Sequence, residues 1–183
     1  MKKILFVVSL LLLMGCAPTV SYKVRDGFTF NKTQSILVLQ KPNDLGSGDT
    51  ITEALMDTKL KIIDRTTLDQ IVQEQKLNLS GAVADSDLET IGKLTKADLI
   101  LTYRGQWGNG YANRWASVSI RVIEVKTGNI VFTTTAKNGD MMGGVNANGL
   151  IEGLNREAAK RLVDCINGKK SEERTESGWG NLP

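Results

Sequence analysis

The block from Lys61 to Thr102 constrains the fold of this chain more than any other stretch. It begins and ends as a short apolar strand, and two segments with helical spacing of apolar residues lie between the strands. Each helical segment opens with a capping box, at Thr67–Gln70 and at Ser86–Glu89. Two strands joined by so long a helical connection are expected to be parallel, with the helices packed on the sheet. The block therefore predicts an α/β fold.

The apolar faces of these two helices follow from the same spacing. They are expected to be Leu68, Ile71, Val72 and Leu79 in the first helix, and Leu88, Ile91, Leu94 and Ala97 in the second. Asp64 and Arg65 lie where the first strand gives way to a helix, which is a common location of active-site residues in parallel sheets. No second group with a matching catalytic role stands near them in the sequence, so we expect a structural role for this pair.

The other apolar runs extend the sheet on both sides of the block. The expected strands are Ser35–Gln40, Leu60–Asp64, Asp98–Trp107, Ala116–Val125 and Ile130–Lys137. A short helix, Thr50–Met56, should connect the first two, and a final helix, about Gly149–Asn167, should pack on the sheet. The prediction is a single α/β domain over residues 34–168, with a mixed sheet of about five strands, crossover helices and a C-terminal helix packed on it.

The strand Ala116–Val125 carries apolar residues in two phases. Val118, Ile120 and Val122 alternate with polar residues, whereas Ile123 and Val125 have the opposite phase. Either both faces of the strand are covered, or a β-bulge intervenes near Val122. The following Lys126–Asn129 is expected to form a hairpin turn, with Gly128 in the left-handed conformation.

Residues 1–15 have the pattern of a secretory signal peptide, with Lys2 and Lys3 before an apolar run that is too short to span a bilayer. The run ends at Leu13-Met-Gly-Cys16, which resembles the bacterial lipobox, in which cleavage leaves a cysteine that takes a diacylglyceryl group. The alternative is an ordinary secretory signal with an incidental cysteine. We expect lipidation at Cys16, and Ala17 after it favours the periplasmic face of the outer membrane. Residues 16–33 would then be a lipidated tether, and the polar residues 169–183 a disordered tail.

Composition restricts the chemistry that this chain can perform. It contains no histidine, which removes the commonest general base and metal ligand, and two cysteines cannot form a Cys-rich zinc site. Removing Lys2 and Lys3 from its 23 basic side chains leaves 21, against 20 acidic ones, so charge gives no case for nucleic acid as a partner. We therefore expect no catalytic, cofactor or metal site and no enzyme activity.

Cys165 shares the apolar stripe of the last helix and is expected to be buried and inert. The full stripe is Ile151, Leu154, Ala158, Leu162 and Cys165.

One group of side chains is typical of protein interaction surfaces. It lies at the expected connection between two strands and consists of Arg104, Trp107, Tyr111, Arg114 and Trp115. Tryptophan, tyrosine and arginine are enriched at binding hot spots, and the glycines of this segment argue against deep burial. We expect a candidate partner surface here. The alternative is that both indoles fold back over the sheet edge.

The runs "IIDR…LDQIVQEQKLNLSGAV…IGKLTKADLILT" and "VSIRVIEVKTGNIV" resemble the CsgG/HfaB family, whose best-known member is the curli secretion channel subunit of the bacterial outer membrane. The resemblance covers roughly Ile36 to Ala136. In that family two hairpins inserted into the periplasmic domain build the pore, and Asp64-Arg65 matches a pair that recurs at its turn. The corresponding connections here hold only about ten residues each, less than a membrane-inserted hairpin needs. The resemblance thus implies the soluble domain without the pore.

This resemblance implies a role in protein contact from a lipid anchor. We expect a non-enzymatic lipoprotein that binds a protein partner in a cell-envelope or curli-like secretion assembly, with a homo-oligomer possible. One alternative is an LpoB-like activator of a peptidoglycan synthase. Another is a channel-associated subunit that needs a second chain to supply the pore.

Overall fold

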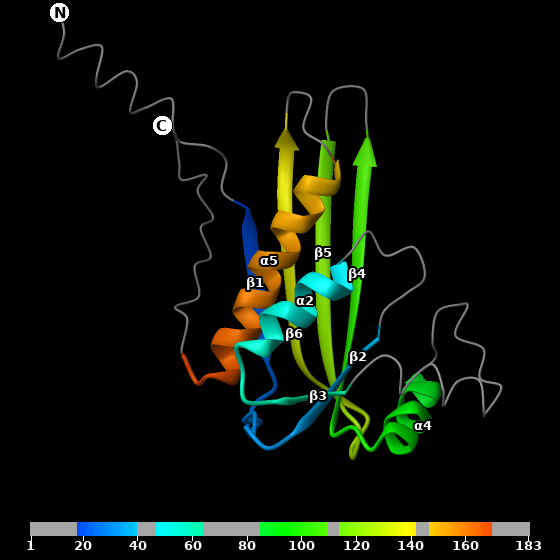
Figure 1. The fold of residues 1–183 in the computed structure, drawn as a ribbon. Coiled ribbons are helices and arrows are strands. Elements are labelled where there is room, and N and C mark those ends of the chain that lie inside the picture. Colours follow the sequence, from blue (N-terminus) through cyan, green and yellow to red (C-terminus); the bar gives the residue numbers. More distant parts are fainter. Residues whose placement is uncertain (1–17, 40–46, 64–84, 110–113, 142–146, 170–183) are drawn as a thin grey trace, which may run out of the picture.

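A computed structural model describes residues 18–39, 47–63, 85–109, 114–141 and 147–169 (Figure 1). The elements in chain order are β1 (Thr19–Val24), β2 (Ser35–Leu39), α2 (Ser47–Met56), β3 (Lys61–Ile63), α4 (Asp85–Thr95), β4 (Leu99–Asn109), β5 (Arg114–Glu124), β6 (Asn129–Met141) and α5 (Ala147–Ile166). The first expected helix of the central block, together with Asp64 and Arg65, lies outside the described residues. No described helix is long and apolar enough to cross a membrane.

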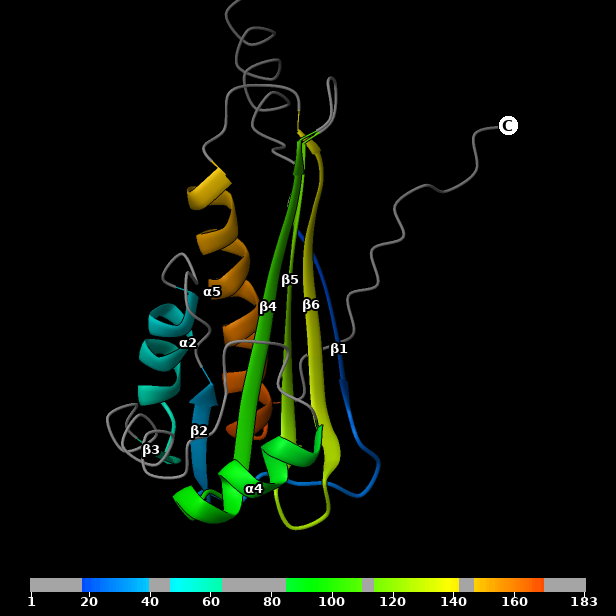
Figure 2. The same cartoon turned by 90° about the vertical axis from the view of Figure 1, so that its right-hand side faces the viewer.

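The strands form one six-stranded mixed sheet in the order β1-β6-β5-β4-β2-β3. The strands β3 and β4 flank β2 and both run parallel to it, which confirms the parallel arrangement expected from the central block. The remaining neighbours are antiparallel. The helices α2 and α5 cover one face of the sheet, and α4 covers one end of the other (Figure 2). The predicted α/β class and the packed C-terminal helix are confirmed.

The sixth strand comes from the segment that the sequence analysis assigned to the tether. Residues Thr19–Val24 form β1, which pairs antiparallel with β6 at the edge of the sheet. Val20, Tyr22 and Val24 alternate along β1 and pack against the core, while the residues between them are exposed. This strict alternation is typical of a strand that is covered on one face, so the sequence carried a signal for β1 that the tether assignment overlooked.

The main core fills the space between the sheet and the helices α2 and α5. Its most buried large side chains include Ile36, Ile51, Leu55, Leu101, Ile120, Phe132, Leu154 and Leu162. Ile151, Leu154, Ala158 and Leu162 of α5 are all buried, as their spacing predicted. Because β2 is buried on both faces, Ile36 and Val38 belong to this core, whereas Leu37 and Leu39 point to the opposite side.

A second, smaller core lies under α4 on the opposite face of the sheet. It consists of Leu37, Leu39, Ile91, Ala97, Ile100, Ile123 and Val125. Ile91 and Ala97 were expected to be buried, but Leu94 is 39% exposed. The prediction for Leu94 was wrong because the buried face of α4 passes through Ile91 and Thr95, which leaves Leu94 at its margin. The helix ends at Thr95, and Lys96 adopts a left-handed φ of 54°. Ala97 therefore reaches the core from beyond the helix.

Both interpretations of the two-phase strand are correct. Val122 faces the main core and Ile123 the core under α4, so both faces are covered. The pairing of β5 with β6 also shifts register between Val122 and Ile123. The extra residue is Val131 of β6, since Val122 pairs with Phe132 and Ile123 with Ile130. Gly128 has the expected positive φ, 68°.

The helix α4 approaches the sheet so closely that residue 92 must lack a side chain. A Cβ on Gly92 would lie 2.4 Å from Val125 Cγ2. We expect Gly92→Ala to destabilise the fold, because overpacking costs about 1–3 kcal/mol. The higher helix propensity of alanine offsets at most about 1 kcal/mol of this.

A matched control for this prediction exists in α5. A Cβ on Gly153 would have no atom within 4 Å, so Gly153→Ala should raise the free energy of unfolding slightly. Denaturant unfolding of both variants measures the difference. Equal stabilisation by the two substitutions would show that α4 does not pack this closely on β5.

Candidate interaction surface

The predicted cluster of tryptophan and arginine residues lies on a β-hairpin. Arg104 and Trp107 belong to β4, Arg114 and Trp115 belong to β5, and Tyr111 lies outside the described residues. Each strand therefore extends two residues into the expected loop, because the antiparallel ladder continues to the pair Asn109–Arg114. Glycines at 105 and 108 do not break the ladder, since β5 supplies hydrogen-bonding partners opposite them.

The hairpin separates the cluster into two groups on opposite faces. Trp107 lies opposite Ala116 on the face that α5 covers, and Trp115 lies opposite Gly108 on the other face. Since successive strand residues alternate in direction, Arg104 shares the face of Trp115. The cluster is thus not one continuous surface, and the side chain of Arg114 is not among those described.

Both tryptophans are exposed, as a partner surface at this cluster would require. Trp107 is 57% exposed and Trp115 is 44% exposed. A Cβ on Gly105 would contact Ile151 Cγ2 at 3.8 Å, so α5 reaches the level of residue 105, and Trp107 lies two residues beyond it. The indole of Trp115 rests against the backbone of β4, because a Cβ on Gly108 would lie 2.2 Å from its Nε1 atom. Both indoles therefore have large accessible areas near the free end of the hairpin.

The side of the sheet opposite α5 carries three transverse rows of side chains across β1, β6, β5 and β4. The rows are Lys23–Thr133–Arg121–Thr102, Ser21–Thr135–Ser119–Arg104 and Thr19–Lys137–Ser117–Gln106. We call these twelve residues the open face. Its side chains are hydroxyls, one amide and four cations, and it includes no carboxylate. Strand spacing of about 4.8 Å gives each row a width of roughly 14 Å.

Hydrogen bonds between rows and across strands order the open face. With the Gln106 amide oriented to place its oxygen toward Arg104, the guanidinium Nε and Nη2 donate to it at 3.2 and 2.9 Å. The hydroxyls of Ser119 and Thr135 lie 3.2 Å apart. No described carboxylate pairs with Lys23, Arg104, Arg121 or Lys137. Among the described residues, these side chains therefore present positive charge without a paired carboxylate along one side of the sheet.

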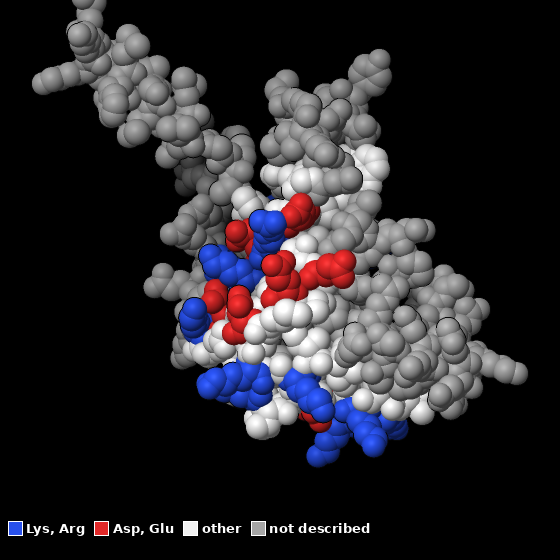
Figure 3. Space-filling model, viewed as in Figure 1, with Lys and Arg blue, Asp and Glu red and all other residues white. Residues whose placement is uncertain are grey.

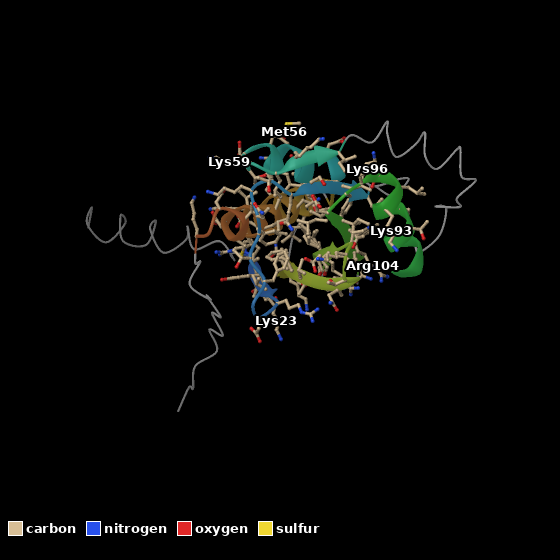
Figure 4. All side chains as sticks on the ribbon, turned by 90° about the horizontal axis from the view of Figure 1, so that it is seen from below. Lys23, Met56, Lys59, Lys93, Lys96 and Arg104 are labelled. Carbon is tan, nitrogen blue, oxygen red and sulfur yellow. The ribbon has the colours of Figure 1, made fainter. Side chains whose placement is uncertain are left out.

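The opposite, helix-covered side has a different electrostatic character. Acidic and basic side chains of α2 and α5 are intermixed there (Figure 3). The ion pair between Glu152 and Arg156 is one example. Viewed from below, Lys23 lies on the side of the molecule away from Met56 of α2 (Figure 4). The open face and the helix-covered face thus differ in the distribution of their charges.

Sequence reasoning identified only Arg104 among the four cations of the open face. Lys23, Arg121 and Lys137 are distant in the sequence and come together only through the pairing of β1 with β6 and of β6 with β5. The available signal was the alternation of Ser, Thr and basic residues within each strand. This alternation predicts a shared surface only when the register of strand pairing is known.

A shallow hollow lies at the upper edge of the open face. It is lined by Thr19, Gln106, Trp115, Ala116, Ser117, Lys137 and Asn138. Within the described ranges, no group of three or more His, Cys, Asp or Glu side chains could hold a metal ion. The hollow combines one indole, one ammonium group and several hydrogen-bonding groups, which suits contact with a polar or anionic surface.

The thiol of Cys165 lies on the opposite side, at the end of α5. It is half-buried rather than fully buried, because Ile166 takes the deepest position in the last turn. Burial raises the pKa of the Cys165 thiol, and the neighbouring Asp164 carboxylate raises it further. The thiolate fraction at neutral pH is therefore small, which disfavours nucleophilic chemistry.

Comparison with known proteins finds solved structures whose fold resembles that of this chain. No family model matches the sequence, and a search of curated proteins found no match. A variant of the PelC dodecamer from Paraburkholderia phytofirmans has a TM-score of 0.52 at 11% identity, over 80% of this chain and 99% of that chain. Lipoprotein GNA1162 from Neisseria meningitidis has a TM-score of 0.49 at 14% identity, over 73% and 99%. The LpoB C-terminal domain from Escherichia coli has 0.47 at 17% identity, over 62% and 87%. The chain is similar to PelC in its fold.

Proposed function

We propose that this chain is a lipid-anchored, non-enzymatic binding component of a cell-envelope or secretion assembly, held at the periplasmic face of the outer membrane. The lipobox-like sequence ending at Cys16 supports the anchor. The resemblance of residues 36–136 to the CsgG/HfaB family supports the assembly role. The observation that carries the binding role is the open face, a broad sheet surface with charge of one sign, of which seven of the twelve residues are exposed.

The open face favours an acidic protein partner. Four cations without described carboxylate partners attract an anionic surface over several ångströms and accelerate encounter. The seven hydroxyls between them can donate to carboxylates or backbone carbonyls once the partner has docked. Because the face belongs to paired strands, its side chains keep fixed spacings and lose little freedom on binding.

This role is tested by reversing two charges at the centre of the open face. We expect Arg104→Glu with Arg121→Glu to abolish capture of protein partners from detergent-solubilised envelopes, with the native lipoprotein as bait. The control is Lys59→Glu with Lys126→Glu, which makes the same change of net charge outside the open face. Thermal melting of both variants should stay close to that of the unmodified protein, since all four side chains are exposed. Retention of the same partners by the first variant would refute the open face as the binding surface.

Self-association is a second candidate, favoured by the dodecamer that PelC forms. Two copies cannot pair open face to open face without strong charge repulsion, so a ring would use other surfaces. Sedimentation of the acylated protein in detergent distinguishes a monomer from a homo-oligomer. An LpoB-like activator of a peptidoglycan synthase and a channel-associated subunit are both compatible with the same anchor and the same open face.

A further inference from the structure

The strand β1 restricts where a lipid anchor can leave the domain. Only Ala17 and Pro18 separate Cys16 from Thr19, the first residue of β1. A fully extended chain advances at most about 3.6 Å per residue, so Cys16 lies within roughly 11 Å of Thr19. A long tether is therefore excluded by the pairing of β1 with β6, and the anchor position follows from that of Thr19.

Thr19 lies at the end of the sheet that carries the two tryptophans. It pairs with Lys137 and lines the same hollow as Trp115. Trp115 stands one row beyond Thr19 along the strands, a step of roughly 7 Å. The opposite end of the domain carries Lys59, Lys93 and Lys96 (Figure 4). An acylated Cys16 thus brings the hairpin end of the sheet, rather than this lysine-rich end, to the bilayer.

The chemistry of the hairpin end suits the interfacial layer of a membrane. Trp107 and Trp115 stand at the same level on opposite faces of the hairpin, and both are exposed. Indoles favour the headgroup region, where the ring is partly apolar and its N–H finds acceptors. Lys137 lies in the same hollow as Trp115, and its ammonium group can reach phospholipid phosphates while its stem stays among apolar groups.

We propose that the part of the β4–β5 hairpin that carries Trp107 and Trp115 rests in the headgroup layer of the membrane that holds the Cys16 acyl chains, with both indoles among the phospholipids. This inference rests on the proposed lipid anchor and assigns the two tryptophans to lipid rather than to a protein partner. The sheet then extends away from the bilayer. The open face lies farther from the bilayer than the tryptophans and is directed parallel to the membrane surface.

Quenching by brominated phospholipids tests the orientation. The native acylated protein carrying Trp179→Phe is reconstituted into phosphatidylethanolamine vesicles with and without brominated acyl chains. Trp107 and Trp115 are then its only indoles. We expect a strong loss of emission in the brominated vesicles and a blue shift relative to detergent-free protein that lacks the acyl chains. Unchanged emission in both kinds of vesicle would overturn the proposal.

A control places a single indole at the other end. In the background Trp107→Phe, Trp115→Phe and Trp179→Phe, the change Leu94→Trp introduces a reporter on the exposed side of α4. This reporter should not be quenched. Quenching of the reporter without quenching of Trp107 and Trp115 would show the reverse orientation. Blue-shifted but unquenched hairpin indoles would show that a second copy of the chain covers them instead of lipid.

The failure of this inference can be distinguished from failure of the anchor. Mass spectrometry of the Cys16 peptide and flotation of the vesicles report acylation and membrane attachment directly. If the protein is acylated and floats while both hairpin indoles stay unquenched, only the orientation is wrong. If the peptide carries no acyl group, the proposed function loses its anchor first.

Discussion

Replacement of Leu162 by alanine should lower the free energy of unfolding by about 2–5 kcal/mol. Leu162 is fully buried on the stripe that faces the sheet. The substitution removes three carbon atoms from a packed core, and the loss combines their transfer free energy with the cost of the cavity. Urea or thermal unfolding measures the effect.

The matched control for Leu162 is Lys160→Ala, two residues earlier on the exposed side of the same helix. It should change the free energy of unfolding by about 0.5 kcal/mol or less. Removal of residues 171–183 should also have little effect, because their composition offers few apolar groups to bury. Comparable losses from Leu162→Ala and Lys160→Ala would show that this stripe does not form the core.

Substitution of Cys16 by serine should transfer the whole protein from the membrane fraction to the soluble periplasm. A serine hydroxyl cannot take the thioether-linked diacylglyceryl group, and the acyl chains on one residue provide stable attachment. Cell fractionation and immunoblotting measure the distribution, and mass spectrometry of the N-terminal peptide measures the modification.

The second cysteine provides the control for this relocation. Cys165→Ser makes the same atomic change at a half-buried position in α5 and should leave the protein in the membrane fraction. Persistent association of the Cys16→Ser protein with outer membranes, in the absence of a bound partner, would contradict the lipid anchor.

Local patterns predicted the parts of the fold whose stability depends on burial. The buried stripe of α5 and the runs of β2 and β4 are apolar enough to be recognised without knowledge of their neighbours. The bulge near Val122 also followed from the change of phase, although the extra residue proved to be Val131 on the paired strand. These features require only that an apolar face be covered.

The features that escaped prediction depend on strand pairing. Residues Thr19–Val24 are half polar, and their strand structure comes from hydrogen bonds to β6, more than a hundred residues away. Gly108 was expected in the connection between two strands, but in a ladder a glycine gives room for a neighbouring side chain, here that of Trp115. The candidate surface was therefore identified only in part. Trp107 and Trp115 were recognised from the sequence, whereas the rows of the open face were not.

The position of β1 also determines how the domain would carry mechanical load. If Cys16 is held in a bilayer and a partner pulls on the sheet, the tension enters the domain through Thr19 and runs along the strand axis. The six residue pairs between β1 and β6 are then loaded together in shear rather than opened one after another. The bonds from the Thr134 hydroxyl to the Ser21 carbonyl and from the Arg25 amide to the Val131 carbonyl, both 2.9 Å long, reinforce the same seam. The segment that was expected to be a flexible tether is thus a strand of the sheet. Through this strand an envelope assembly would transmit force to its lipid anchor.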